Sequence, residues 1–157
     1  MTPIYGWGKK GKKIIIKNAI PKKRYTLICA INKNKVIGYK IIKGSANAVD
    51  FKEFIIEIIK KIRGKKYLLM DNARIHHSKI VKEYMYKTKN EIIFNAPYSP
   101  EMNPIEHLFS KIKGIIRNKK TNTETKRLIK NIEKALSKVT RKEIENYYKK
   151  SLNFCEK

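Results

Sequence analysis

The chain contains short apolar runs of two kinds, some with the pattern of β-strands and some with that of α-helices. The runs Tyr25–Ile31 and Val36–Ile42 are rich in β-branched residues, which favours strands. Because the segment Asn32–Lys35 between them is polar and turn-like, the two strands are predicted to form a hairpin. The preceding residues, 1–23, are basic and interrupted by glycine and proline, with one apolar triplet at Ile14–Ile16.

A helix is predicted after the hairpin. Apolar residues recur three and four positions apart from Phe51 to Ile62, which is the spacing of one face of an α-helix. Asn47 is the expected N-cap, with Asp50 at the third helical position, and Gly64 is expected to end the helix.

Shorter elements follow. Tyr67–Met70 is an apolar run that closes on Asp71, which predicts a buried strand with polar residues at its C-terminal end. Ser78 is expected to cap a helix that runs to Lys87, and Ile92–Phe94 is predicted to be another strand. This order of strands and helices is typical of an α/β domain with a mixed sheet.

The C-terminal part is predicted to be helical. Three closely spaced prolines predict an extended loop, which leads into a helix from about Asn103 to Arg117. Two further helices are expected, because two pairs of residues have capping-box spacing: Thr121 with Glu124, and Thr140 with Glu143.

The charge of the chain indicates a class of partner. Its 157 residues suffice for one domain, and 38 lysines and arginines against 13 acidic residues give a net charge of +25. Such an excess points to a polyanionic partner, most simply nucleic acid. Only six of the cations are arginines, and lysine, isoleucine and asparagine dominate together, which indicates an AT-rich coding sequence. Part of the charge therefore has a second explanation, a compositional bias spread over solvated surfaces.

Composition also argues against several classes of protein. No run of 18 apolar residues is present, so no membrane span is expected, and the N-terminus lacks the apolar stretch of a secretory signal. Cys29 and Cys155 form no C-x-x-C motif, which argues against a disulfide framework and a cysteine-built zinc site. A cytoplasmic protein is the expectation.

Three segments carry the candidate chemistry: Tyr5–Gly11 (YGWGKKG), Met70–Ser78 (MDNARIHHS) and Asn95–Lys113 (NAPYSPEMNPIEHLFSKIK). Together they resemble the catalytic domain of DDE transposases, specifically the mariner superfamily and its bacterial insertion-sequence relatives. The third segment is the most specific, since a Pro-Tyr-Ser-Pro loop that runs into Asn-Pro-Ile-Glu and a helix rarely arises by chance. The 34 residues between Asp71 and Glu106 are also a spacing typical of that family. The resemblance covers about residues 5–117.

The resemblance implies a ribonuclease-H-like α/β fold, with a mixed sheet flanked by helices and a helical tail at about residues 121–152. It also implies metal-dependent DNA cleavage and strand transfer during transposition, with Mg²⁺ or Mn²⁺ as the cofactor. The implied partners are transposon ends and target DNA, together with a second copy of the chain or an upstream transposase segment. A prokaryotic protein of this kind would be associated with the nucleoid.

Asp71 and Glu106 are implied to be catalytic metal ligands. Displacement at phosphorus is well served by two divalent metals, which prefer carboxylate oxygens on rigid elements. Asp71 follows a predicted strand, where α/β sheets tend to present ligands, and Glu106 lies in the first turn of a predicted helix. Taken singly, each has a structural explanation: a strand-end turn for Asp71, and a favourable charge at a helix N-terminus for Glu106.

Four other residues are candidates near this site. Asn72 and His76 match the family's Asp-Asn…His pattern and are expected nearby, although a histidine beside a carboxylate is more often a structural group. Lys113 and Arg117 share a helix stripe with Glu106 and are candidate contacts to DNA phosphates. A solvated helix face would have the same spacing.

One carboxylate of the family pattern has no counterpart here. The family uses three, and the first, an aspartate, lies on a strand upstream of the Tyr-Gly-Trp stretch. Here Tyr5 is only four residues from Met1, and the one other aspartate, Asp50, is expected to be a helix-cap charge. We therefore expect residues 1–157 to form a single truncated domain without its first strand. In the implied fold that strand lies in mid-sheet, so its absence is expected to separate the hairpin from the strand before Asp71.

Three functions remain open at this level. The first is the catalytic portion of a DDE transposase, inactive as this fragment. The second is an enzymatically dead, non-specific basic DNA-binding fragment of a decayed insertion sequence. The third possibility, a general nucleic-acid-binding protein of other ancestry, is disfavoured by the Pro-Tyr-Ser-Pro segment. A pseudogene remnant, a second frame joined by frameshifting and a late start codon would each produce such a chain.

Overall fold

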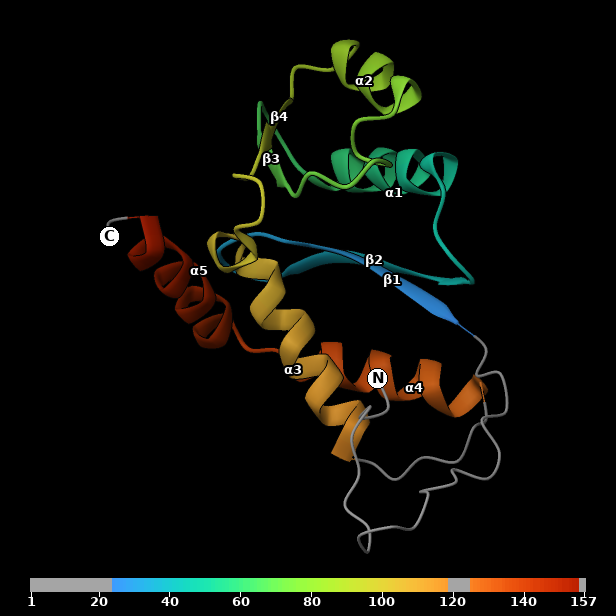
Figure 1. Ribbon diagram of the computed structural model, residues 1–157, viewed down its shortest axis with the longest axis vertical. Helices are drawn as coiled ribbons and strands as arrows, with labels where there is room; N and C mark the ends of the chain where they lie inside the picture. Colours follow the sequence, from blue (N-terminus) through green and yellow to red (C-terminus); the bar gives the residue numbers. More distant parts are fainter. Residues whose placement is uncertain (1–23, 119–124, 156–157) are drawn as a thin grey trace, which may run out of the picture.

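The computed structural model describes residues 24–118 and 125–155, and Figure 1 shows how its elements are arranged. Strands and helices alternate in the first part of the chain, and helices make up the rest. The elements are β1 (Tyr25–Ile31), β2 (Val36–Lys43), α1 (Ala48–Lys61), β3 (Tyr67–Met70), α2 (Lys79–Tyr86), β4 (Glu91–Phe94), the short 3-10 helix η1 (Pro100–Met102), α3 (Pro104–Asn118), α4 (Thr125–Ser137) and α5 (Arg141–Cys155).

The predicted hairpin is confirmed. β1 and β2 pair antiparallel, with Cys29 opposite Tyr39. In the turn, the Asn32 Oδ1 accepts hydrogen bonds from the N–H groups of Asn34 at 2.9 Å and Lys35 at 2.8 Å. Such bonds from an asparagine side chain to the following backbone favour a turn over continued strand, so the local sequence determines where the hairpin reverses.

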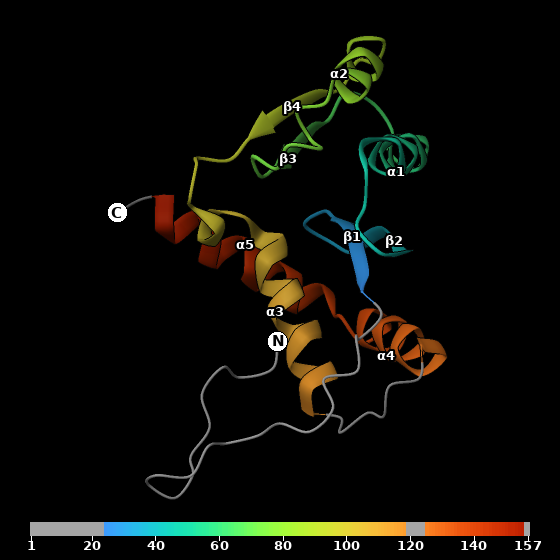
Figure 2. The same cartoon turned by 45° about the vertical axis from the view of Figure 1, so that its right-hand side comes forward.

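β3 and β4 form a second pair, which is parallel, with Tyr67 opposite Glu91 and Met70 opposite Phe94. Within the described residues the two pairs share no ladder of hydrogen bonds, so the sheet is split between β1 and β3. Figure 2 shows the hairpin and the β3–β4 pair as separate units, with α1 alongside both. The hairpin and the strand before Asp71 are thus separated among the described residues, as expected.

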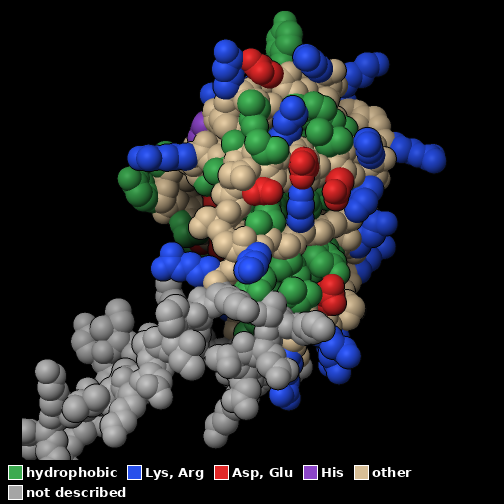
Figure 3. Space-filling view, turned by 90° about the vertical axis from the view of Figure 1, so that its right-hand side faces the viewer, with side chains coloured by type: hydrophobic (Ala, Val, Ile, Leu, Met, Phe, Trp, Pro, Cys, Tyr) green, Lys and Arg blue, Asp and Glu red, His purple; other side chains and the backbone are tan. Residues whose placement is uncertain are grey.

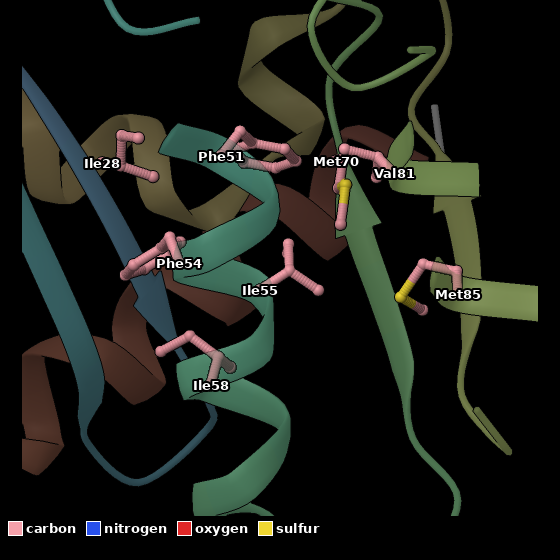
Figure 4. Close-up of a cluster of buried hydrophobic side chains, with 8 residues drawn as sticks. All are labelled: Ile28, Phe51, Phe54, Ile55, Ile58, Met70, Val81 and Met85. Carbon is pink, nitrogen blue, oxygen red and sulfur yellow. The ribbon is translucent and has the colours of Figure 1, made fainter. Parts of the chain in front are cut away.

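Two hydrophobic clusters lie on opposite faces of the hairpin. Side chains of β1 alternate between them, because successive residues of a strand point to opposite faces. The α1 cluster contains the buried side chains of Ile28, Phe51, Phe54, Ile55, Ile58, Met70, Val81 and Met85. Figure 4 shows the side chains of α1 between Ile28 of β1 and Met70 of β3. The α3–α4 cluster contains those of Cys29, Leu108, Ile112, Ile132, Ala135 and Leu136. The hairpin is thus covered by α1 on one face and by α3 and α4 on the other.

The start of α1 is as predicted, but its end is not. Asn47 Oδ1 accepts the N–H of Asp50 at 2.9 Å, and Asp50 Oδ2 accepts the N–H of Asn47 at 3.0 Å, which completes a capping box. The prediction that Gly64 ends the helix is wrong. The extended Ile62 already closes the last turn through a hydrogen bond from its N–H to the carbonyl of Ile59, so Gly64, at a φ of 70°, belongs to the following turn.

Two other predicted caps have different outcomes. Ser78 is the N-cap residue of α2, as predicted, but its side chain makes no capping hydrogen bond. The third-position N–H, from Val81, bonds to the Ser78 backbone carbonyl at 3.1 Å instead. In α5 the predicted box is formed, since Glu143 Oε2 accepts the Thr140 N–H at 2.9 Å. The predicted pair Thr121 and Glu124 lies outside the described residues.

β3 is less buried than predicted. Met70 is buried, but Tyr67 and Leu69 are 61% and 44% exposed, and Ile93 beside them on β4 is 47% exposed. The opposite face of the pair packs on the α1 cluster, so burial of β3 is one-sided. The prediction of a fully buried strand therefore fails on the face that carries Tyr67 and Leu69.

A cavity of about 570 Å³ lies where the sheet is split. β1 and β3 both line it, with apolar side chains of α1 and of the first turns of α3. Polar groups line it as well, among them Asp71, Asn103 and Glu106. The cavity is therefore a mostly apolar slot whose lining includes two carboxylates.

Candidate functional site

Asp71 follows the last residue of β3, and its carboxylate is held by its own loop. Oδ1 accepts the N–H of Ala73 at 3.0 Å and lies 2.8 Å from Nδ1 of His76. The same ring nitrogen is 3.0 Å from the carbonyl oxygen of Asp71. The His76 side chain is only 15% exposed, and its ring packs on Phe51 at a centroid distance of 4.3 Å. The carboxylate is 56% exposed, so it is fixed on one side and open on the other.

Asn72 connects this loop to the segment after β4. Its Nδ2 donates to the carbonyl oxygen of Asn95 at 2.6 Å, and its Oδ1 lies 3.1 Å from Nε2 of His77. The His77 ring stacks on Phe94 of β4 with centroids 4.0 Å apart. The Asp-Asn…His pattern therefore joins the ends of the two parallel strands, and Asn72 and His76 lie next to Asp71.

Glu106 lies in the first turn of α3. Its N–H donates to the carbonyl oxygen of Asn103 at 3.1 Å, and the buried Asn103 side chain accepts the N–H of Ile105 at 3.3 Å. The Glu106 carboxylate is half-buried and has no hydrogen bond or ion pair with any described residue. A carboxylate without a cationic partner in so basic a chain is free to bind a cation.

The structure brings Asp71 and Glu106 to the same cavity. Their oxygens are hard ligands of the kind that Mg²⁺ and Mn²⁺ prefer. Within residues 24–118 and 125–155, however, no three side chains of His, Cys, Asp and Glu gather as a metal site. The two carboxylates are therefore suitable ligands for a divalent metal, but two are fewer than such a site needs. That they bind a metal together stays a prediction.

The other residues singled out from the sequence have different surroundings. Asp50 is in the α1 capping box, as predicted. Cys29 of β1 is buried as a member of the α3–α4 cluster, and burial raises the pKa of its thiol to about 12. Lys113 on α3 is exposed, whereas the Arg117 side chain is not among those described. The roles of Lys113 and Arg117 as DNA contacts stay predictions.

Positive charge is spread over the surface. On the face that Figure 3 shows, lysine and arginine side chains are scattered from top to bottom, and a few acidic side chains lie among them. This scatter is what compositional bias would produce, and it gathers no single basic groove on that face. Among the described helices, none has the length and apolarity needed to cross a bilayer.

Sequence reasoning overlooked two buried asparagines. Asn95 and Asn103 are 9% and 7% exposed, and they hold the two ends of the loop between β4 and α3. Asn95 donates from Nδ2 to the carbonyl oxygen of Ser99 at 2.6 Å and from its backbone N–H to Met70 at 2.8 Å. A signal was present, because both precede a proline within two positions, and asparagine at such places commonly organises a turn.

Comparisons with known proteins agree with the resemblance to mariner-type DDE transposases, which is confirmed. The family model described as DDE superfamily endonuclease matches residues 1–129. The fold is similar to that in the Mos1 strand transfer complex, at 18% identity and a TM-score of 0.78, over 98% of this chain and 48% of that chain. The chain thus spans about half the length of that transposase chain. No curated protein sequence matches it.

Two structures of the isolated Mos1 catalytic domain are also similar. One is of the catalytic domain of Mos1 mariner transposase, at 18% identity and a TM-score of 0.70, over 85% of this chain and 70% of that chain. The other is of the Mos1 catalytic domain with Raltegravir and Mg, with the same identity and TM-score, over 85% of this chain and 71% of that chain. The fold is therefore the ribonuclease-H-like α/β fold of these domains, and by the family match this chain belongs to the DDE superfamily endonucleases.

Proposed function

We propose that this chain is the catalytic-domain portion of a DDE transposase, which cuts and joins DNA strands by metal-dependent phosphoryl transfer during transposition. The observation that carries the proposal is that Asp71 and Glu106, from elements far apart in the sequence, line one cavity. Similar solved structures of Mos1 hold Mg or Mn. A protein that acts on DNA in this way would work in the cytoplasm, at the nucleoid of a prokaryotic host.

In this proposal Asp71 and Glu106 hold Mg²⁺ or Mn²⁺, which when bound would stabilise the charge on the attacking and leaving oxygens of the phosphate. His76 is a positioning residue, because its ring is packed on Phe51 and contacts the Asp71 carboxylate at 2.8 Å. Asn72 ties the same loop to Asn95. The half of the Asp71 carboxylate that remains exposed is therefore presented in one orientation.

A third carboxylate is needed to complete such a site. We infer that it comes from a strand that occupies the slot between β1 and β3. Both facing strands have one free edge within the described residues, the slot lining is mostly apolar, and Asp71 and Glu106 also line it. A strand that ends in aspartate would satisfy both edges and bring its carboxylate beside Asp71. The 157-residue chain alone is accordingly expected to be inactive.

Nicking and strand transfer on a labelled duplex with Mg²⁺ or Mn²⁺ test the proposal. The chain as given should show no useful activity, and the chain extended by an apolar strand ending in aspartate should gain it. Asp71→Asn and Glu106→Gln in the extended chain should abolish activity while the fold is retained. Activity of the extended chain that survives both substitutions would sink the proposed site.

The alternative, a dead basic DNA-binding fragment, predicts binding without chemistry. Lysine-rich surfaces bind mainly through phosphates, so affinity should fall steeply with salt and vary little with sequence. Titration of unrelated duplexes at about 50 and about 200 mM salt measures both properties. Salt-insensitive binding to one sequence would contradict this expectation. An extended chain that binds DNA but never cuts it would favour this alternative.

A further inference from the structure

The turn between β4 and η1 holds a tyrosine in an unusual backbone conformation. The Ser99 N–H donates to the carbonyl oxygen of Ala96 at 3.3 Å, which closes a four-residue turn with Pro97 second and Tyr98 third. Tyr98 has a φ of 58° and is the only non-glycine residue with positive φ among those described. With proline second, a positive φ at the third position is the pattern of a type II turn, which prefers glycine there. A bulky side chain at such a position marks strain retained by its surroundings.

The surroundings fix this turn firmly. The buried Asn95 binds the Ser99 carbonyl through Nδ2 at 2.6 Å and the Met70 carbonyl through its N–H at 2.8 Å. The carbonyl of Asn95 in turn accepts Nδ2 of Asn72 at 2.6 Å. The turn is thereby bonded to the end of β3 and to the residue that follows Asp71. The Tyr98 side chain, by contrast, is fully exposed, at 102% of the exposure of a free residue.

Charge separates this segment from the rest of the molecule. Residues 90–110 contain no lysine or arginine, although the whole chain has 38. This is the longest stretch of the sequence without a cation. This segment, which runs through β4 into α3, therefore has no cation with which to neutralise a phosphate. Its one fully exposed large side chain, Tyr98, has an aromatic face that can stack on a base without any charge.

We propose that Tyr98 stacks on an unpaired nucleobase of DNA next to the strand end held at the Asp71–Glu106 site. The inference rests on the proposed function, because strand cutting generates the ends at which a base face becomes accessible. Inside a duplex each base face is covered by its neighbours, so only an unpaired or extruded base can accept the ring. Strain at Tyr98 is consistent with this role, since the backbone holds the ring out in solvent before DNA arrives.

The test uses the full 157-residue chain and two labelled DNAs, a blunt duplex and the same duplex with a short single-stranded overhang that carries 2-aminopurine. The chain should bind the overhang DNA more tightly and quench the 2-aminopurine. Tyr98→Ala should weaken overhang binding by about tenfold, the usual effect of one lost base stack, and abolish the quenching. Tyr98→Phe should retain both, and blunt-duplex affinity and the salt slope should stay unchanged.

Two further variants separate stacking from folding. Tyr98→Gly should lose the quenching while its melting temperature rises, because glycine removes the strain of positive φ. Tyr86→Ala is the matched control, because Tyr86 is 93% exposed on the regular helix α2, and it should bind both DNAs like the unaltered chain. Quenching that persists in Tyr98→Ala, or equal losses on blunt and overhang DNA, would overturn the proposal. If the proposed catalytic site were wrong but Tyr98 stacked as proposed, the 157-residue chain would still quench 2-aminopurine in the overhang, whereas the extended chain would not cut DNA.

Discussion

Single residues tie the C-terminal helices to the rest of the fold. Glu143 closes the capping box of α5 with Thr140 and receives the Lys111 ammonium of α3 at 2.5 Å. The hydrogen bond from Lys111, followed by that from the Thr140 N–H, lowers the pKa of Glu143 from its ordinary value of 4.5. Folding thus favours the charged carboxylate. Its contribution to stability is complete above about pH 4.5 and is lost as the pH falls through the lowered pKa.

Replacing Glu143 by glutamine should therefore lower the free energy of unfolding by about 1 kcal/mol near neutral pH, as loss of a cap partner does. The deficit should shrink as both proteins are acidified, and thermal melts across the pH range measure it. Glu145→Gln is the control, because the exposed Arg141–Glu145 pair within one helix contributes only a few tenths of a kcal/mol. A deficit that stays constant down to about pH 3 would show that Glu143 acts through something other than its charge.

Cys29 gives a second prediction at this scale. Burial raises the pKa of its thiol to about 12, so almost no thiolate exists near neutral pH. In a Cys155→Ser background, Cys29 should react with a thiol reagent only as fast as the protein opens. The rate should rise with urea in step with unfolding. Labelling at the rate of a free cysteine in native buffer would mean that β1 is not packed against the α3–α4 cluster.

At the scale of elements, the sequence predicted those turns and helix ends that are formed by contacts between neighbouring residues. The hairpin turn at Asn32, the Asn47 box and the Thr140 box follow from side chains that bond to neighbouring backbone, so the sequence alone was enough. The burial of β3 was mispredicted because it depends on which distant elements cover each face of the β3–β4 pair. Within the site, the placement of Asp71 and Glu106 was expected from the resemblance. The clamp that Asn95 forms was not, because it joins residues that are far apart in sequence.

α3 offers a prediction about packing. Leu108 is fully buried at the centre of the α3–α4 cluster, so Leu108→Ala should lower the free energy of unfolding by about 3 kcal/mol through loss of burial and the cavity left behind. Leu152→Ala on α5 should change it by less than about 0.5 kcal/mol, because Leu152 is 59% exposed. Urea unfolding of the two variants measures the difference. Similar losses would mean that α3 is not the centre of this cluster.

At the scale of the whole molecule, the split sheet leaves two units, and α1 packs both on the hairpin and on α2. On the β3–β4 pair, Tyr67, Leu69 and Ile93 are exposed, so among the described residues this pair packs mainly on its other face. Elements with few buried contacts open more readily than the rest. We therefore expect the hairpin, which is covered on both faces, to open less readily than the β3–β4 pair.

Filling the slot should change both stability and metal binding. Adding an upstream apolar strand that ends in aspartate should raise the melting temperature, because the free edges of β1 and β3 become paired. The same extension should raise Mn²⁺ affinity, and an extension that ends in asparagine should raise the melting temperature alone. A polar extension of equal length is the control. If the aspartate extension altered neither quantity, the inference that a strand occupies the slot between β1 and β3 would be wrong.

The division into two clusters also predicts when Asp71 and Glu106 come together during folding. Asp71 follows β3, which packs in the α1 cluster, whereas Glu106 starts α3, which packs in the α3–α4 cluster. A chain that has formed only one cluster therefore displays only one of the two carboxylates. We expect the pair to come together only when the clusters dock across β1, because contacts between residues far apart in sequence form slowly. Half-folded forms of the chain are therefore expected to present Asp71 or Glu106 singly, and a site that needs both carboxylates could form only after the clusters have docked.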